Sequence, residues 1–575
     1  METEETSPFR VASTVRALRF ALRRDAENGG DAERADSGER SANERDKLWF
    51  KESSAKNLRN RDFLAPNTVL ATLYAHGQVP PAVLSRILTL RGNGVLPVAG
   101  CEVTAEGLRV SVDHCAAFRG VLCGMAAYLR PAAQRQGCVL INCPALHAKQ
   151  APPSPDSLTL GQLRTILIAD HIGALLRRQG YSVSFCPGLP EESDIINYLR
   201  TLGIDWPAVS VSWTNEDREE KIRNILENCT YREREKERGK RGSKGEEMER
   251  GDGGMTDEVR INLKRVMEEV ELHGYDPSLG TCTVQREALC HLAQLDRAIE
   301  DFPVSMATVL HVTSCQDEFR QQQTAMLWRA AGTTATQRLV ICGPVKTPGC
   351  QMSSAQYLQL RRAQMKDASE MKYGDQVEGQ TWEDIIRVMT CATVRFELLS
   401  TVHTSPVTLD VQREGVVSTK GPRGGVFVMY NCARLHTLFS SYEKGVEQGL
   451  YPEVPAGTEL DFSALKEEGE WLLLFNYLIP FSELLDQSAQ ALELEGGGAR
   501  VNLRTEQVLS LTSYPLFISL PLPPSPTLSL SIYLTSEPLP HLFNQMFCRL
   551  LLLKALRELY HNALDSLNLP PIPQL

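Results

Sequence analysis

The spacing of hydrophobic residues predicts an α/β region in the first two thirds of the chain. Four short apolar runs have the length and alternation of buried strands, at residues 137–144, 181–185, 307–314 and 338–345. Between the first two runs, hydrophobic residues recur every three or four positions over residues 160–176, and Gly180 follows as a typical helix end. Because strand, helix and strand succeed one another, we predict a Rossmann-like parallel sheet.

The last third of the chain has the pattern of amphipathic helices. Hydrophobic residues recur at helical spacing in four long stretches, at residues 382–400, 426–445, 464–492 and 542–568. Each of these helices must bury its apolar side against a neighbouring helix, so we predict a helical bundle over residues 381–575. The predicted fold class is therefore α/β followed by all-α.

The first 135 residues show neither pattern clearly. Residues 1–60 are charged and interrupted by glycine, which predicts a largely disordered segment with a short helix at residues 15–22 at most. Residues 61–135 mix short helical patterns with alternation and predict a small α+β domain. The Rossmann-like domain then occupies residues 136–380.

A charged insertion interrupts the Rossmann-like domain at about residues 216–255. Its front half has helical character and its back half is of low complexity, so we expect most of it to be disordered. Two interpretations stay open, a solvated tail or a basic arm that contacts RNA. Helical patterns resume at residues 259–270 and 286–302.

A proline-rich stretch at about residues 511–540 interrupts the predicted bundle. Residues 511–534 carry no charge but contain five prolines, each of which removes a helix hydrogen bond. A membrane-spanning helix must satisfy its backbone internally, so we predict an irregular loop and no membrane span.

Composition narrows the classes of function. The chain of 575 residues has a net charge of −10, so an RNA site has to be a local basic patch on an acidic body. Its fifteen cysteines form no Cys-x-x-Cys pair, and the N-terminus is not a signal peptide. We therefore expect reduced thiols, a cytoplasmic protein and no metal site.

Two motif regions of the α/β part resemble the class I arginyl-tRNA synthetases. The run "NCPALHAK" keeps Pro144, Ala148 and Lys149 of the family's Ser-Pro-Asn-x-Ala-Lys pattern, and "TLGQLRTILIADHIGALLRRQGYSV" is similar to the helix that follows. In this alignment the two signature histidines are replaced by Thr159 and Gln162, whereas Gly161 and Leu163-Arg164 remain. His171, in the triplet His-Ile-Gly, lies about 18 Å further along the helix. We expect it to be an ordinary, partly exposed helix residue.

The second signature is also altered. Gln351-Met352-Ser353 stands where the family has its Lys-Met-Ser-Lys-Ser loop, and Glu318 replaces a histidine between Gln316 and Phe319. The lost lysine and histidines would stabilise the phosphates of ATP. The resemblance therefore implies a synthetase-like frame without catalysis, with no catalytic residue and no cofactor.

The C-terminal part resembles the DALR anticodon-binding domain. "YNCARL" matches the family's Tyr-x-x-Ala-Arg helix, "ATVRFELLS" resembles the helix before it, and "KALR" at residues 554–557 stands where the domain's name places Asp-Ala-Leu-Arg. Bases of an open loop need aromatic stacking and amide or guanidinium groups, and phosphates need cations. The resemblance implies RNA contacts at Tyr430, Asn431, Arg434, His436, Arg549, Lys554 and Arg557. The alternative is that the tyrosine is part of the core and the arginines form a solvated helix face.

The resemblance implies a non-catalytic adapter that binds arginine tRNAs through the anticodon arm. Within this family, the nearest match further implies that the tRNA is presented to a partner methyltransferase, which makes 3-methylcytidine in the anticodon loop. The glycine-rich run at residues 421–425 follows no strand, so we predict a loop and no S-adenosylmethionine site. Two alternatives stay open: an active arginine–tRNA ligase, and a protein scaffold without RNA binding.

Overall fold

The structure is a computed structural model. It describes residues 7–23, 48–58, 60–74, 77–131, 134–148, 153–209, 216–233, 258–300, 302–303, 307–374, 379–411, 424–490, 499–513 and 540–573.

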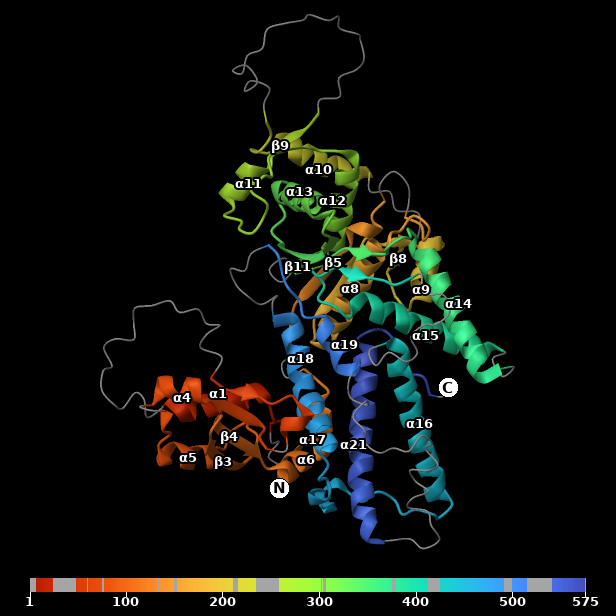
Figure 1. Ribbon diagram of the computed structural model, residues 1–575. Helices are drawn as coiled ribbons and strands as arrows, with labels where there is room; N and C mark the ends of the chain where they lie inside the picture. The colour runs from red at the N-terminus through yellow and green to blue at the C-terminus, as the bar shows by residue number, and fades with distance from the viewer. Residues whose placement is uncertain are drawn as a thin grey trace, which may run out of the picture.

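The predicted parallel sheet is present at the centre of the molecule (Figure 1). Its strand order is β12-β11-β5-β6, and all neighbours are parallel. The strands are β5 (Cys138–Asn142), β6 (Ser182–Cys186), β11 (Ala307–Ser314) and β12 (Thr336–Cys342). These bounds match the four apolar runs, because strands that are covered on both faces must be apolar throughout.

Helices cover both faces of this sheet. On one face, Val139 and Ile141 join the core that contains α8 (Leu160–Arg178). On the other face, Leu140 and Val309 belong to a second core. That core includes residues of α10 (Glu216–Asn228), α12 (Arg286–Ala298) and α13 (Glu318–Ala330). The result is a three-layer α/β/α domain, as expected from the alternation of side chains along each strand.

The helical part begins before the predicted boundary at residue 381. It consists of α14 (Ser354–Tyr373), α15 (Gln380–Leu399), α16 (Gly425–Glu447), α17 (Glu468–Leu473), a π-helical turn (Leu474–Leu478), α18 (Ile479–Gln490), α19 (Glu506–Ser513) and α21 (Pro540–Asp565). Helix α14 is bound to α15 by ion pairs, with Arg361 Nε 3.0 Å from Glu397 Oε2 and Arg362 Nη2 2.6 Å from Glu383 Oε2.

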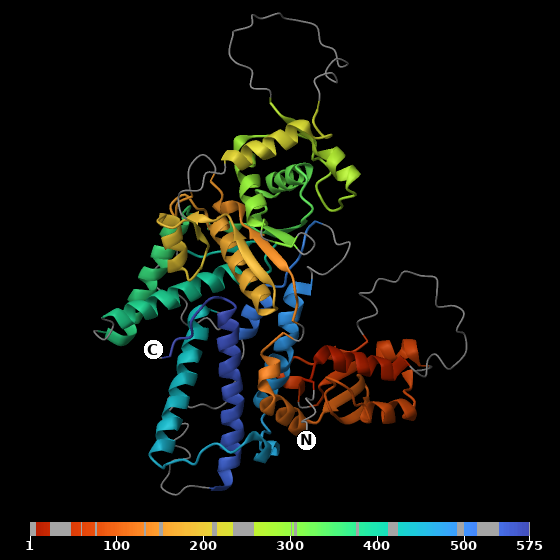
Figure 2. The ribbon, with the colours of Figure 1, turned by 180° about the vertical axis from the view of Figure 1, so that it is seen from behind.

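The N-terminal part forms an antiparallel sheet of order β1-β2-β4-β3 with helices on it. Its elements are α1 (Val11–Arg23), β1 (Phe50–Lys51), α3 (Ala55–Leu58), β2 (Phe63–Pro66), α4 (Asn67–Leu73), α5 (Pro81–Leu88), β3 (Val98–Thr104), β4 (Gly107–Val112), α6 (His114–Cys123) and α7 (Met125–Tyr128). This domain lies beside α17 and α18 (Figure 1 and Figure 2). There Trp471 Nε1 donates a hydrogen bond to buried Asp62 at 2.7 Å, and its ring stacks on that of His114.

The N-terminal domain is larger than the sequence pattern predicts. Residues 11–23 form α1, whose Leu18 and Leu22 are fully buried, and β1 pairs with β2. The described residues of 1–60 therefore belong to a folded domain and not to a disordered segment. The sequence interpretation was dominated by the charged run that follows α1, whereas α1 itself buries Leu18 and Leu22 along one side.

Other expectations for irregular or helical segments also change. The front of the insertion has the helical structure that its pattern indicates, but this helix, α10, is packed into the α/β domain through Ile222 and Leu226 and is not part of a disordered insertion. The predicted helix at residues 259–270 starts instead as a strand, β9 (Arg260–Asn262), which pairs with β10 (Thr281–Thr283) and precedes α11 (Leu263–Glu269). The low-complexity half of the insertion, most of the proline-rich stretch and residues 412–423 lie outside the described residues.

His171 is fully buried, which contradicts the prediction of a partly exposed residue. Its Nδ1 lies 2.6 Å from the carbonyl oxygen of Ser566, and burial lowers the pKa of the ring. The prediction failed because the side of α8 away from the sheet is covered by the C-terminal end of the chain, which lies 395 residues further on.

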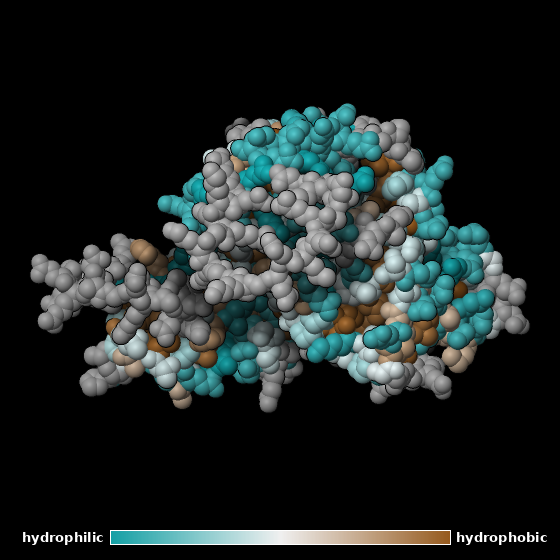
Figure 3. All heavy atoms as spheres, turned by 90° about the horizontal axis from the view of Figure 1, so that it is seen from above, coloured by the Kyte–Doolittle hydropathy of each residue, from teal (hydrophilic) through white to brown (hydrophobic). Residues whose placement is uncertain are grey.

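In the view from above in Figure 3, most of the coloured atoms are hydrophilic, and hydrophobic atoms show in patches among them. Among the described residues, no helix is long and apolar enough to cross a membrane.

Candidate nucleic-acid interface

Helix α16 carries the matched Tyr-x-x-Ala-Arg motif and presents part of it to solvent. Tyr430 is 39% exposed, and the guanidinium carbon of Arg434, one turn later, lies 5.8 Å from the centre of its ring. Lys372, from the end of α14, approaches the same ring with Nζ at 5.3 Å. Neither cation makes an ion pair with any residue that the structure describes. Two uncompensated charges therefore flank an exposed aromatic ring, which is a suitable surface for bases and phosphates.

A second basic group lies where α16 meets α21. The guanidinium carbon of Arg557 lies 4.3 Å from the centre of the Phe439 ring. His561, one turn further along α21, has its pKa lowered by burial first, and then by the charges of Arg557 and His436. Two of the predicted residues, His436 on α16 and Arg557 on α21, therefore both act on His561 where the two helices meet.

Three of the predicted RNA-binding residues stand apart from these two groups. Lys554 is exposed on α21. Asn431 is only 2% exposed, so it faces the core and is not placed to contact RNA. Arg549 Nε lies 2.6 Å from Oε1 of the fully buried Glu470, which neutralises its charge. The structure thus leaves Tyr430, Arg434, His436, Lys554 and Arg557 at the surface.

Lys372 was not among the residues predicted from the sequence. It lies on a different helix, 58 positions before Tyr430, and no motif includes it. The sequence shows only the run Met371-Lys372-Tyr373 at the end of a helical pattern. This run does not indicate a binding residue until the structure shows that α14 lies close to α16.

The N-terminus of α8 is closed by its own side chains. Thr159 Oγ1 accepts a hydrogen bond from the backbone N–H of Gln162 at 3.2 Å, and Gln162 Oε1 accepts one from the N–H of Thr159 at 2.9 Å. Such a capping box satisfies N–H groups that a helix N-terminus could otherwise offer to a phosphate. Thr159 also bridges to Ser353, so the segments that resemble the two family signatures lie side by side.

Arg164, the retained arginine of the first motif, is a structural residue. It is fully buried and donates to the carbonyl oxygens of Leu398 at 3.0 Å, Gly343 at 2.9 Å and Ser405 at 2.6 Å. It therefore fixes α8 to the end of α15. Lys149, the retained lysine of the first strand motif, lies outside the described residues.

A hydrogen-bonded cluster of histidines occupies the carboxyl end of β5. Asn142 accepts from His147 Nε2 at 2.7 Å and donates to His311 Nδ1 at 3.0 Å, while His311 Nε2 donates to Gln337 at 3.0 Å. Desolvation lowers the pKa of His147 to about 3 and that of His311 to about 4, and it places the pKa of His291 well below its usual value. All three rings are therefore neutral at physiological pH.

The cavity next to these histidines is small. Pro144, His147, His291 and Asp317 contribute to its walls, and its volume is about 50 Å³. Ligand sites of parallel sheets lie at this carboxyl edge, but pockets for small molecules usually measure about 300–1,000 Å³. The space present here does not accommodate a nucleotide.

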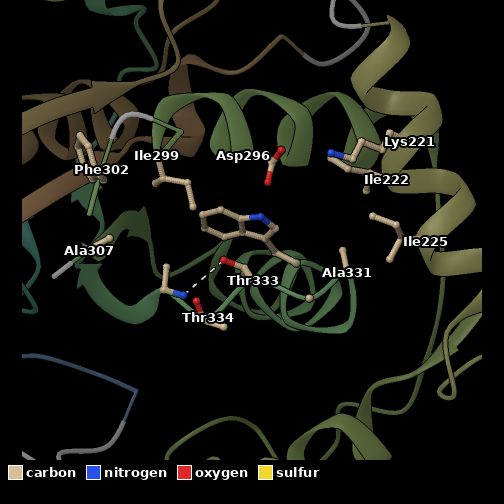
Figure 4. A pocket seen from close by; sticks show the side chains of 13 residues that line it. Lys221, Ile222, Ile225, Asp296, Ile299, Phe302, Ala307, Ala331, Thr333 and Thr334 are labelled. Carbon is tan, nitrogen blue, oxygen red and sulfur yellow. Dashed lines mark hydrogen bonds between the residues drawn. The ribbon is translucent and has the colours of Figure 1, made fainter. Parts of the chain in front are cut away.

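A larger cavity lies at the opposite, amino edge of β11 and β12 (Figure 4). Its volume is about 300 Å³, and α10 contributes Lys221, Ile222 and Ile225 to its walls. It contains none of the predicted RNA-binding residues. Among the described residues, no group of three His, Cys, Asp or Glu side chains is placed to hold a metal ion.

Comparisons with known proteins decide the family. Residues 9–128 match the family model for the DALR, N-terminal domain. The chain is 75% identical over 572 residues to DALR anticodon-binding domain-containing protein 3 of Danio rerio, with 100% of both chains covered. It is 37% identical over 551 residues to the protein of the same name from Mus musculus, with 92% of this chain and 96% of the relative covered. The chain belongs to the DALR anticodon-binding domain-containing protein 3 family.

Solved structures establish the fold of this family member. The chain is similar to Thermus thermophilus arginyl-tRNA synthetase with a TM-score of 0.57 at 15% identity, covering 97% of this chain and 100% of the synthetase. It is similar to the arginyl-tRNA synthetase of Plasmodium falciparum with a TM-score of 0.58 at 10% identity, and the match covers 99% of this chain and 100% of that synthetase. The arginyl-tRNA synthetase-like fold predicted from the sequence is therefore confirmed. The match over residues 9–128 also agrees with α1 being part of the N-terminal domain.

Proposed function

We propose that the protein is a non-catalytic tRNA-binding adapter that holds the anticodon arm against α16. The observation that carries this proposal is the exposed ring of Tyr430 between Arg434 and Lys372, two cations without an acidic partner among the described residues. On a chain with a net charge of −10, such a local concentration of free positive charge and aromatic surface favours nucleic acid. Arg557 and His436 extend the basic surface along the other side of α16.

The absence of synthetase activity is the second part of the proposal. The side chains in place of the signature histidines, Thr159 and Gln162, cap α8, and the cavity at the carboxyl edge of the sheet has a volume of about 50 Å³. Neither side chain is cationic, so neither can stabilise the charge on the phosphates of ATP as a signature histidine would. Preference for arginine tRNAs and presentation of the tRNA to a 3-methylcytidine methyltransferase rest on the family resemblance.

The first experiment measures which tRNAs the full-length chain retains. Total tRNA is passed over the immobilised protein at two salt concentrations, since phosphate contacts are salt-dependent, and the bound tRNAs are sequenced. We expect arginine tRNAs to be enriched. Arg434→Glu and Arg557→Glu should each lower retention, and Arg265→Glu on the distant α11 serves as the charge-matched control. Unselective binding contradicts the preference for arginine tRNAs, and equal retention by all variants contradicts the proposed interface.

The second experiment tests catalysis and presentation separately. Arginine-dependent exchange between ATP and pyrophosphate should not exceed a blank without enzyme; exchange above that blank would show an active ligase. A 3-methylcytidine methyltransferase should modify arginine tRNA faster when this protein is added, and Arg434→Glu should remove that stimulation. Tight binding of tRNA without any stimulation would leave tRNA binding supported and contradict the adapter role.

A further inference from the structure

The tip where α14 ends and α15 begins carries an aromatic cluster that no motif marks. The rings of Tyr373 and Trp382 lie 5.1 Å apart between their centres, at an angle of 46°. Both are half-buried, so each keeps part of its surface open to solvent. Lys372 Nζ lies 4.7 Å from the centre of the Tyr373 ring. We call Lys372, Tyr373 and Trp382 the tip cluster.

The tip cluster is continuous with the surface on α16. Lys372 lies over the ring of Tyr373 and also over that of Tyr430, so a single ammonium group connects the two surfaces. A cation between two aromatic faces is held in position by both of them, yet it keeps donors for a third group. A phosphate that binds Lys372 would therefore lie close to both aromatic rings.

The polar atoms of these aromatic side chains form no hydrogen bonds within the described part of the chain. The hydroxyl groups of Tyr373 and Tyr430 and the indole N–H of Trp382 form no hydrogen bond with any described residue. Aromatic residues with polar atoms usually satisfy them when they belong to a core. Met371, next to the cluster, is 73% exposed. These features are typical of a contact surface and not of a packed helix end.

We propose that the tip cluster is a stacking site for an unpaired base of the bound RNA, with Lys372 contacting the adjacent phosphate. This inference rests on the proposed function and adds a second contact from α14 and α15. The bases of a duplex are stacked on one another and show only their edges, whereas a loop nucleotide can place its face on an aromatic ring. The site therefore recognises single-stranded loop nucleotides, without strong preference among bases.

The test compares two RNA probes on the full-length chain: a stem–loop with the sequence of an arginine tRNA anticodon arm, and its stem as a blunt duplex. Since stacking is worth about 1–3 kcal/mol per base, Trp382→Leu and Tyr373→Leu should each weaken binding of the stem–loop by roughly 5- to 150-fold. Neither should change binding of the duplex. Lys372→Glu should weaken binding of both probes and reduce the salt dependence, whereas Lys366→Glu on the same helix is the charge-matched control.

Fluorescence gives a readout that a purely structural role would not change. Adding the stem–loop should quench part of the tryptophan emission of the wild-type protein. Trp382→Phe keeps an aromatic face and should retain most of the affinity while losing that quenching. Wild-type affinity of both leucine variants, together with a loss in Arg434→Glu, would overturn the tip cluster and leave the α16 interface intact. No binding of either probe by the wild-type protein would overturn both.

Discussion

The buried ion pair between Asp170 and Arg395 should contribute strongly to the stability of the whole molecule. Arg395 Nη1 donates to Asp170 Oδ2 at 2.8 Å, and the two side chains are 0% and 4% exposed. Asn568 donates to the other carboxylate oxygen at 2.9 Å, and Arg395 Nη2 donates to the carbonyl of Leu202 at 3.1 Å. The pair thus joins α8 of the α/β domain, α15 of the bundle and the end of the chain.

Asp170→Asn keeps the shape of the side chain but leaves the guanidinium group buried without a counter-charge. Removing one partner of a buried ion pair typically costs about 3–5 kcal/mol. We expect a loss of this size in the first urea unfolding transition, followed by circular dichroism and tryptophan fluorescence. The dependence on urea concentration should be unchanged, because the surface exposed on unfolding is the same.

A double variant separates the missing counter-charge from a general loss of packing. Asp170→Leu combined with Arg395→Met removes both charges and keeps apolar volume at the site. Because well-packed hydrophobic residues often replace buried ion pairs without loss, it should be clearly more stable than Asp170→Asn. A loss below about 1 kcal/mol in Asp170→Asn, or a double variant less stable than either single one, would refute this reasoning.

Three other predictions follow from the described contacts. Gly173→Ala places a methyl group 2.5 Å from Cζ of Phe185, so overpacking should lower the free energy of unfolding by about 1–3 kcal/mol. In the folded protein the histidine cluster stays neutral, because the pKa of His311 is lowered to about 4, whereas a histidine of the unfolded chain takes up a proton near pH 6.5. The free energy of unfolding should therefore be at its full value above pH 6.5 and should fall as the pH decreases towards 4. Urea titrations at several pH values measure this dependence. His311→Gln should flatten that dependence. Arg549→Gln leaves Glu470 buried without its cation, so it should lower the melting temperature while leaving the affinity of the folded protein for tRNA unchanged; weaker binding would place Arg549 at the interface.

The candidate site could be predicted from the sequence only in part. Tyr430 and Arg434 belong to one motif and are one helical turn apart, so a helix brings them together wherever it packs. Asn431 belongs to the same motif but is rotated towards the core, and its burial depends on α16 being covered by its neighbours. Lys372 and the buried partner of Arg549 lie on other helices, so only the packing of the bundle identifies them.

Hydrophobic spacing is sufficient to locate the local elements whose pattern is strong. The four strands of the parallel sheet and helix α8 lie where the hydrophobic spacing predicts them, because an apolar strand covered on both faces leaves few alternatives. The motifs also identified the arginyl-tRNA synthetase-like fold. The sequence pattern did not reveal α1 as part of a domain, since the charged run that follows it dominates the composition of residues 1–60.

Contacts between distant parts of the chain were decided by the tertiary structure alone. His171 is buried because the chain returns to cover α8 at Ser566, and the charge of Asp170 is compensated by Arg395 from another domain. Periodicity reports which side of a helix is apolar, but it carries no information about which distant segment will cover a polar residue. The partners of polar residues therefore follow from the packing of domains, and in this protein they separate buried charges that hold the frame together, such as Asp170 and Arg395, from exposed cations such as Lys372.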